Sequence, residues 1–132
     1  MSGSTNLLLL FNHTPTALQV EDARRSLGVA AIHCLPEDLK PVWDSVPPGL
    51  DAIEPHLAPV RSWVLQTARA GDYILVQGDF GATYLMVKFS FERGLIPVYS
   101  TTERNAVEEP AEDGTVRLSH QFRHVRFRRY GE

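Results

Sequence analysis

Short apolar runs alternate with stretches of helical periodicity along this chain. Residues 7–11 are apolar at every position and predict a strand over residues 7–12, after an opening segment at residues 1–5. Similar runs at residues 29–35, 72–77 and 95–99 predict three further strands. A continuous apolar run is typical of a parallel strand buried on both faces, so we expect these strands to form a parallel sheet.

Helical patterns fill most of the space between these runs. Thr16 and Gln19 have the spacing of a capping box, which predicts a helix that begins at Thr16 and ends at Gly28. Two more helices are predicted over residues 57–70, closed by Gly71, and over residues 82–92, ended by Gly94. The proline-rich segment 36–55 favours no long regular element, although Trp43 offers a large side chain for packing.

The alternation of strands and helices predicts one α/β domain over residues 1–132, with a Rossmann-like, mostly parallel sheet and flanking helices. The sequence EDGT at residues 112–115 contains an Asp-Gly hairpin signal. We therefore expect residues 105–109 and 116–128 to add a C-terminal antiparallel β-hairpin.

Composition limits the class of protein. With 43% hydrophobic and 22% charged residues, the chain has the composition of a folded globular domain. The net charge of -3 does not favour DNA binding. Cys34 is the one cysteine, which excludes an internal disulfide and a cysteine-cluster zinc site, and we expect neither a metal nor a cofactor. Without an export signal or a membrane-spanning stretch, a cytoplasmic location is expected.

Three segments that follow predicted strands carry candidate chemistry. They are residues 12–14, residues 78–83 and residues 100–104, each read as a loop. Because the carboxyl ends of parallel strands meet at one edge of a sheet, we expect these loops to form one rim. Ligands of open α/β sheets bind at that edge.

The motif QGDFGAT at residues 77–83 has two readings. Gly78 and Gly81 would let the chain turn sharply, and the free amides of residues 80–83 would offer an anion site at a helix N-terminus. Asp79 would cap the helix or accept a hydrogen bond from a ribose or base. The alternative is a capped turn between strand and helix that binds no ligand.

The motif STTER at residues 100–104 combines three hydroxyl groups with Arg104, which suits a phosphodiester; the alternative is a polar loop with a solvated arginine. His13 is a candidate general base or simply an exposed histidine. In residues 120–130, strict alternation would place His124, Arg126, Arg128 and Tyr130 on one face and Val125 with Phe127 on the other. That segment is either a nucleotide-binding face or a charged edge strand.

Several motifs together resemble a known family. LFNHTPT, DYILVQGDFGATYLMV, GLIPVYSTTER and FRHVRFRRY look like small ancillary proteins associated with type III CRISPR systems, and the likeness spans residues 7–130. That family resembles the Rossmann-like (CARF-like) domains that sense cyclic oligoadenylate. Its members are thought to be ring nucleases that cut cyclic tetra-adenylate and so end antiviral signalling.

The resemblance implies a site and a partner for this chain. The ligand would be cyclic tetra-adenylate, bound across a homodimer and cut without metal by in-line attack of a ribose 2′-hydroxyl; binding without cleavage is the alternative. We expect His13 as base or leaving-group acid and Arg104 and the amides of residues 81–83 as charge stabilisers. The expected ligand-binding residues are Asn12, Gln77, Gly78, Asp79, Phe80, Gly81, Ala82, Thr83, Ser100, Thr101 and Thr102. An unrelated alternative is an interaction module that uses the basic C-terminal ribbon.

Overall fold

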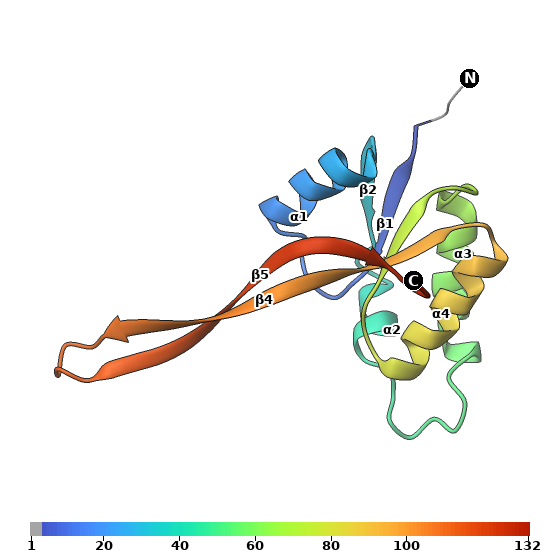
Figure 1. The fold of residues 1–132 in the computed structure, drawn as a ribbon. Helices are drawn as coiled ribbons and strands as arrows, with labels where there is room; N and C mark the ends of the chain where they lie inside the picture. Colours follow the sequence, from blue (N-terminus) through green and yellow to red (C-terminus); the bar gives the residue numbers. More distant parts are fainter. Residues whose placement is uncertain (1–3) are drawn as a thin grey trace.

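A five-stranded sheet forms the centre of the molecule in a computed structural model that describes residues 4–132 (Figure 1). Residues 1–3 of the predicted opening segment lie outside the described residues. The strands are β1 (Asn6–Leu10), β2 (Ala31–Cys34), β3 (Tyr73–Val76), β4 (Ile96–Pro110) and β5 (Val116–Arg129), and their order in the sheet is β2-β1-β3-β4-β5. The first four strands are parallel and β5 is antiparallel to β4. The predicted α/β class, the mostly parallel sheet and the C-terminal hairpin are confirmed.

Helices cover both faces of this sheet. Helix α1 (Ala17–Asp22) continues as the π-helical turn η1 (Ala23–Leu27) and lies on one face. The other face carries α2 (Lys40–Asp44), the short 3-10 helix η2 (Pro55–Leu57), α3 (Ala58–Thr67) and α4 (Phe80–Glu92). The apolar run in β1 serves both layers, because Leu7 and Leu9 pack with Ala23 while Leu8 and Leu10 pack with the opposite helices.

Local sequence signals define several element ends. The capping box is present, since Gln19 N donates to Thr16 Oγ1 at 3.2 Å and Thr16 N donates to Gln19 Oε1 at 2.9 Å. Gly28 ends the first helix in the left-handed conformation, with φ of 68°. The prediction for Gly71 was wrong: α3 ends at Thr67 because Ala68 is already extended, and Gly71 belongs to the turn before β3.

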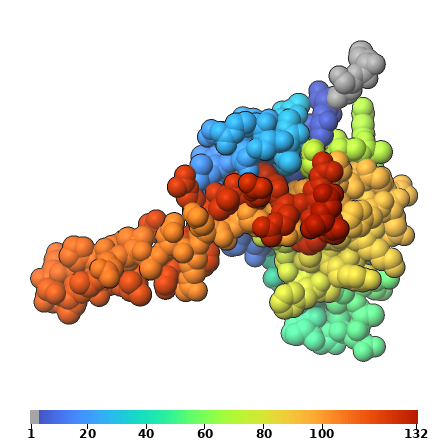
Figure 2. Space-filling model, in the orientation of Figure 1, coloured from blue at the N-terminus to red at the C-terminus, as the bar shows by residue number. Residues whose placement is uncertain are grey.

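Strands β4 and β5 continue far beyond the rest of the sheet as a two-stranded ribbon (Figure 1). In the space-filling view this ribbon projects from the body, and we call its outer part, residues 103–123, the arm (Figure 2). The predicted loop at residues 100–104 was therefore wrong, because Ser100 to Arg104 pair with β5 as part of β4. Backbone pairing on both strands holds this polar sequence extended.

A β-bulge interrupts the ladder where the arm leaves the body. Thr101 pairs with Arg126, but Thr102 pairs with His124, so Val125 is an extra residue without a partner in the ladder. The predicted alternation was wrong for this reason. His124 and Phe127 lie on the same side, with ring centroids 4.6 Å apart, while Val125 is exposed.

Among residues 4–132, no helix is long and apolar enough to cross a membrane.

Candidate functional site

Two hollows lie near the carboxyl ends of the parallel strands, one beside α1 and one beside α4. The strand order reverses between β1 and β3, since β2 and β3 lie on opposite sides of β1. In open α/β sheets a crevice forms outside the strand ends at such a reversal. The residues that follow β1 and β3 are therefore the first candidates for a site.

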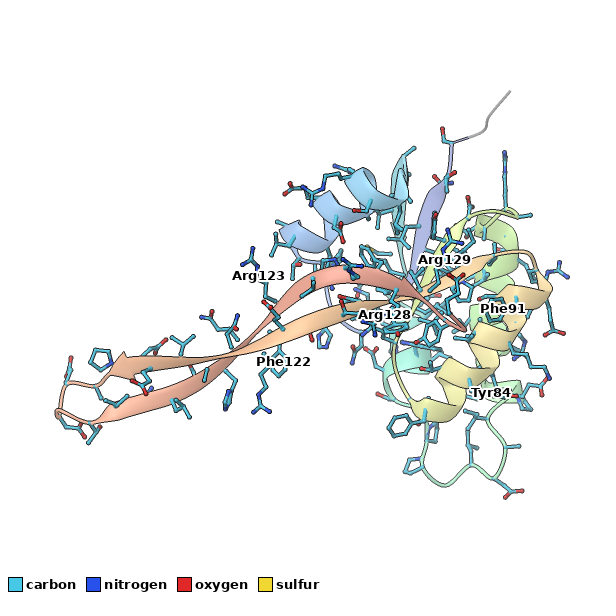
Figure 3. The ribbon with its side chains drawn as sticks, in the orientation of Figure 1. Tyr84, Phe91, Phe122, Arg123, Arg128 and Arg129 are labelled. Carbon is cyan, nitrogen blue, oxygen red and sulfur yellow. The ribbon has the colours of Figure 1, made fainter. Side chains whose placement is uncertain are left out.

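The hollow beside α1, which we call the α1-side hollow, has a volume of about 350 Å³. Its polar walls come from five separate segments and consist of His13, Thr14, Thr16, Gln19, Gln77, Ser100, Thr102 and His124. Two aromatic rings, Phe11 and Phe122, complete it. Figure 3 shows Phe122 where the ribbon leaves the body. Hydrogen-bonding groups together with aromatic surface suit a nucleotide, which presents phosphates, hydroxyls and flat bases.

A chain of hydrogen bonds runs from this hollow into the protein. Ser100 Oγ lies 2.6 Å from His124 Nδ1, and His124 Nε2 lies 2.7 Å from Asp22 Oδ2. Gln19 Nε2 donates to Ser100 Oγ at 3.3 Å, and Ser26 Oγ donates to Asp22 Oδ1 at 2.5 Å. The His124 and Asp22 side chains are only 3% and 11% exposed, so this pair is shielded from water.

The environment of Asp22 stabilises its charged form. Burial raises the pKa of the Asp22 carboxyl, but hydrogen bonds from Ser26 and His124, with the attraction of His124 and Arg25, outweigh burial and hold the pKa below its usual value of 3.8. Asp22 is therefore a carboxylate at neutral pH, and it faces one nitrogen of the His124 ring.

The α4-side hollow is a separate site on the other face of the sheet, with a volume of about 370 Å³. It is lined by Gln77, Gly78, Phe80, Thr83, Tyr99 and Tyr130. The Tyr130 hydroxyl donates to the Val76 carbonyl oxygen at 2.5 Å, and burial, with a smaller contribution from Tyr99, raises the pKa of Tyr130. The prediction of one continuous rim was wrong, because the sheet separates the two hollows and Gln77 alone lines both.

The turn at residues 77–83 is organised around Asp79. Its carboxylate accepts a hydrogen bond from Ala82 N at 3.0 Å, and its carbonyl oxygen accepts from Thr83 N at 2.8 Å. The predicted helix cap is confirmed. The amides of Ala82 and Thr83 are occupied by Asp79, so the prediction that they are free to stabilise a phosphate was wrong.

The two glycines of this turn allow close packing against the segment before α3. A Cβ atom on Gly78 would lie 2.8 Å from Trp43 Nε1, and one on Gly81 would lie 3.0 Å from Ile53 Cδ1. Trp43 Nε1 donates to the Gln77 carbonyl oxygen at 3.0 Å, which holds the indole against the turn. The structure thus supplies a packing reason for both glycines without a ligand.

Replacing Gly78 with alanine is expected to destabilise the protein by about 1–3 kcal/mol, since the added methyl group would overlap the buried Trp43 ring. Urea unfolding measures this loss. Gly49→Ala is the matched control, because a Cβ atom at Gly49 meets no atom within 4 Å. Equal stability of the two variants would contradict the packing role of Gly78.

Sequence comparison shows the family to which this chain belongs. The family model described as "Uncharacterized protein MJ1673 family" matches residues 5–128. The chain belongs to the MJ1673 family. The "Uncharacterized protein MJ1673" of Methanocaldococcus jannaschii is 43% identical over 124 residues, which are 94% of this chain and 95% of that relative. No solved structure was found to match the chain. The matched range includes both hollows' strand ends and the whole arm.

The remaining predicted residues of this MJ1673-family protein lie around the α1-side hollow to different degrees. His13 lines it and packs edge-on against Phe11, with ring centroids 5.2 Å apart, while Asn12 is exposed between these two residues. The Thr101 hydroxyl instead bonds to the backbone of Arg126. Arg104 is not among the lining residues: it is exposed, and its guanidinium carbon lies 5.8 Å from the centroid of the Phe122 ring, which does line the hollow.

Sequence reasoning missed three residues of this hollow and its hydrogen-bond chain. Gln19 was interpreted only as part of a helix cap, and Asp22 was not singled out. His124 was placed on one face with Arg126, Arg128 and Tyr130, as part of a nucleotide-binding face or a charged edge strand, and not in a contact with α1. His124 and Asp22 are 102 positions apart, and no spacing motif joins them.

Within residues 4–132 of the MJ1673-family chain, no three histidine, cysteine or acidic side chains are grouped to hold a metal ion.

Proposed function

We propose that the α1-side hollow binds cyclic tetra-adenylate and that the protein opens this ring without a metal ion. One observation carries the proposal: side chains from the ends of three parallel strands, from α1 and from β5 meet in one hollow. The order β2-β1-β3-β4 of the four parallel strands matches part of a common doubly wound order, and it supports the Rossmann-like (CARF-like) part of the proposal. The resemblance to type III CRISPR ancillary proteins points to the same ligand.

The proposed reaction is a transfer within the substrate. A ribose 2′-oxygen attacks the adjacent phosphorus in line, the new 2′-oxygen to phosphorus bond forms, and the bond from phosphorus to the 5′-oxygen breaks. His13 is placed among the lining residues, and we assign it the proton that the leaving 5′-oxygen takes up. Arg104, at the Phe122 edge, is assigned the negative charge on the phosphate.

A second copy of the chain is part of this proposal. The α1-side hollow is near the small end of the range of about 300–1,000 Å³ for small-molecule sites, so a ring of four nucleotides extends beyond it. A two-fold dimer would offer the same hollow twice to a ligand that has two-fold symmetry. Sedimentation that finds monomers both with and without the ring would count against this arrangement.

Incubation of the pure protein with cyclic tetra-adenylate and EDTA tests the proposed function. We expect linear products, separated by chromatography and identified by mass. An intact ring after many hours with enzyme in excess would contradict cleavage, and tight calorimetric binding in the same sample would support sequestration instead. Cell fractionation checks the cytoplasmic location that this role requires.

A further inference from the structure

We propose that Ser100 carries an activated hydroxyl group, with His124 as its proton acceptor and Asp22 as the residue that positions His124. The inference deepens the proposed function, because it names the group that removes the substrate's 2′-hydroxyl proton. It rests on that function only for the identity of the substrate. The reactivity of Ser100 itself is a property of the chain and is measured separately.

The hydrogen bonds are compatible with proton transfer from Ser100 to His124. Because Asp22 is a carboxylate, it accepts a hydrogen bond, so His124 Nε2 carries the proton in their 2.7 Å contact. In the proposed arrangement the ring is neutral, and its Nδ1 lone pair accepts the Ser100 hydroxyl proton across 2.6 Å. Gln19 Nε2 donates to the Ser100 oxygen and is compatible with this direction. The order of a nucleophile, a base and an orienting carboxylate is that of a serine activated by histidine.

Burial makes this arrangement effective. The His124 side chain is almost wholly shielded, and it lines the α1-side hollow together with Ser100. Ser100 N also donates to Gln77 Oε1 at 2.7 Å, which fixes the strand that presents the hydroxyl group. A base held by a preorganised carboxylate away from water keeps one tautomer and one orientation. Ser100 is therefore the partly exposed end of this proton pathway.

Two backbone irregularities lie next to the residues of this pathway. The β-bulge at Val125 directly follows His124 and breaks the alternation that would apply in a regular strand. The π-helical turn η1 begins directly after Asp22. Bulges re-aim side chains near active sites, and π-helical turns occur frequently at functional sites. Irregular backbone at both partners favours a functional pair over a chance contact between α1 and the sheet.

The proton movements balance in the proposed step. As the 2′-oxygen attacks phosphorus, its proton passes to Ser100 Oγ, and the Ser100 proton passes to His124 Nδ1. The 5′-oxygen leaves and takes a proton from protonated His13. His124 then releases its proton to solvent, and His13 regains one. Ser100 is the catalytic residue that touches the substrate, while Asp22 acts through His124.

A fluorophosphonate reagent tests the activation of Ser100 without any nucleotide. The Ser100 oxygen bonds to phosphorus, fluoride leaves, and His124 takes the hydroxyl proton. We expect one adduct on the folded full-length chain, located at Ser100 by peptide mass mapping and absent in Ser100→Ala. Ser119→Ala, a substitution on the arm, should label like the native protein.

Asp22 variants separate a positioning role from a structural one. Asp22→Asn should slow labelling about a hundredfold or more, because the amide no longer holds the reactive tautomer. Asp22→Glu keeps the carboxylate and should restore much of the rate. Both are compared with the native protein at temperatures well below their measured unfolding transitions.

The outcomes distinguish this inference from the proposed function. An unlabelled Ser100 in the folded native protein, or labelling that is equally fast in Asp22→Asn, would overturn the inference and leave a structural hydrogen-bond network. Ring opening by such a protein would still support the proposed function. Labelling of Ser100 that requires Asp22, in a protein that leaves cyclic tetra-adenylate intact, would support the inference and count against the proposed function.

Discussion

Trp43→Ala is expected to destabilise the protein by about 3–5 kcal/mol, the usual range for removing a large aromatic side chain from a core. Trp43 is 1% exposed and belongs to the core cluster beneath α3 and α4. Its indole also donates to the Gln77 carbonyl oxygen. A domain of this size has a total stability of about 5–15 kcal/mol, so this loss would remove a large part of the free energy of unfolding.

Equilibrium unfolding in urea, followed by circular dichroism, measures the effect of this change. Trp63→Ala is the matched control, because Trp63 is only partly buried against the same cluster and should cause a smaller loss. A smaller effect at Trp43 than at Trp63 would contradict the assignment of Trp43 as the centre of this core. The result also bears on function, since the Trp43 indole holds the turn that contains Gln77.

Asp22→Ala is expected to destabilise the protein by about 1–3 kcal/mol at neutral pH, because it leaves the buried His124 Nε2–H group without its hydrogen-bond acceptor. The neighbouring Glu21 supplies the control. Glu21 pairs with Arg25 at 3.8 Å on the exposed surface, so Glu21→Ala should change stability by no more than about 0.5 kcal/mol.

The effect of Asp22 should depend on pH in a defined direction. Its pKa is lower in the folded protein than the usual 3.8, so the folded state binds the proton less readily than the unfolded state. The stability from this depressed pKa is fully present above about pH 3.8 and is lost as pH falls through the lower folded pKa. Urea unfolding measures the free energy of unfolding of the native protein and of Asp22→Ala at neutral pH and in acid. The difference between these two free energies should be smaller in acid. A difference that stays constant or grows in acid would contradict the lowered pKa of Asp22.

Much of the fold was predictable because its signals are local. The capping box at Thr16, the left-handed Gly28 and the Asp79 helix cap involve residues at most a few positions apart. The Asp-Gly turn likewise predicted the hairpin that joins β4 and β5. Such signals depend on backbone hydrogen bonds within one turn, which the sequence displays directly.

The site was less predictable because its contacts are remote. Gly78 looked like a ligand-binding glycine because its neighbour Trp43 lies far away in the sequence. The pairing of His124 with Asp22 depends on α1 docking onto the sheet. The orientation of His124 depends on a bulge, and counting alternate residues assumes a ladder without one. The errors at Gly78 and at the His124–Asp22 pair came from tertiary contacts that the local pattern does not display.

The arm is attached to the rest of the molecule only at its inner end, which we call the root. A two-stranded ribbon is marginally stable alone, so amide hydrogen exchange should accelerate from the root toward the turn at residues 111–115. Its exposed apolar side chains, including Val116, Leu118 and Phe122, contribute little to the core of the body. Substitutions in the outer arm would then be selected for their effect on binding to other molecules, while substitutions in the body would be selected for their effect on folding.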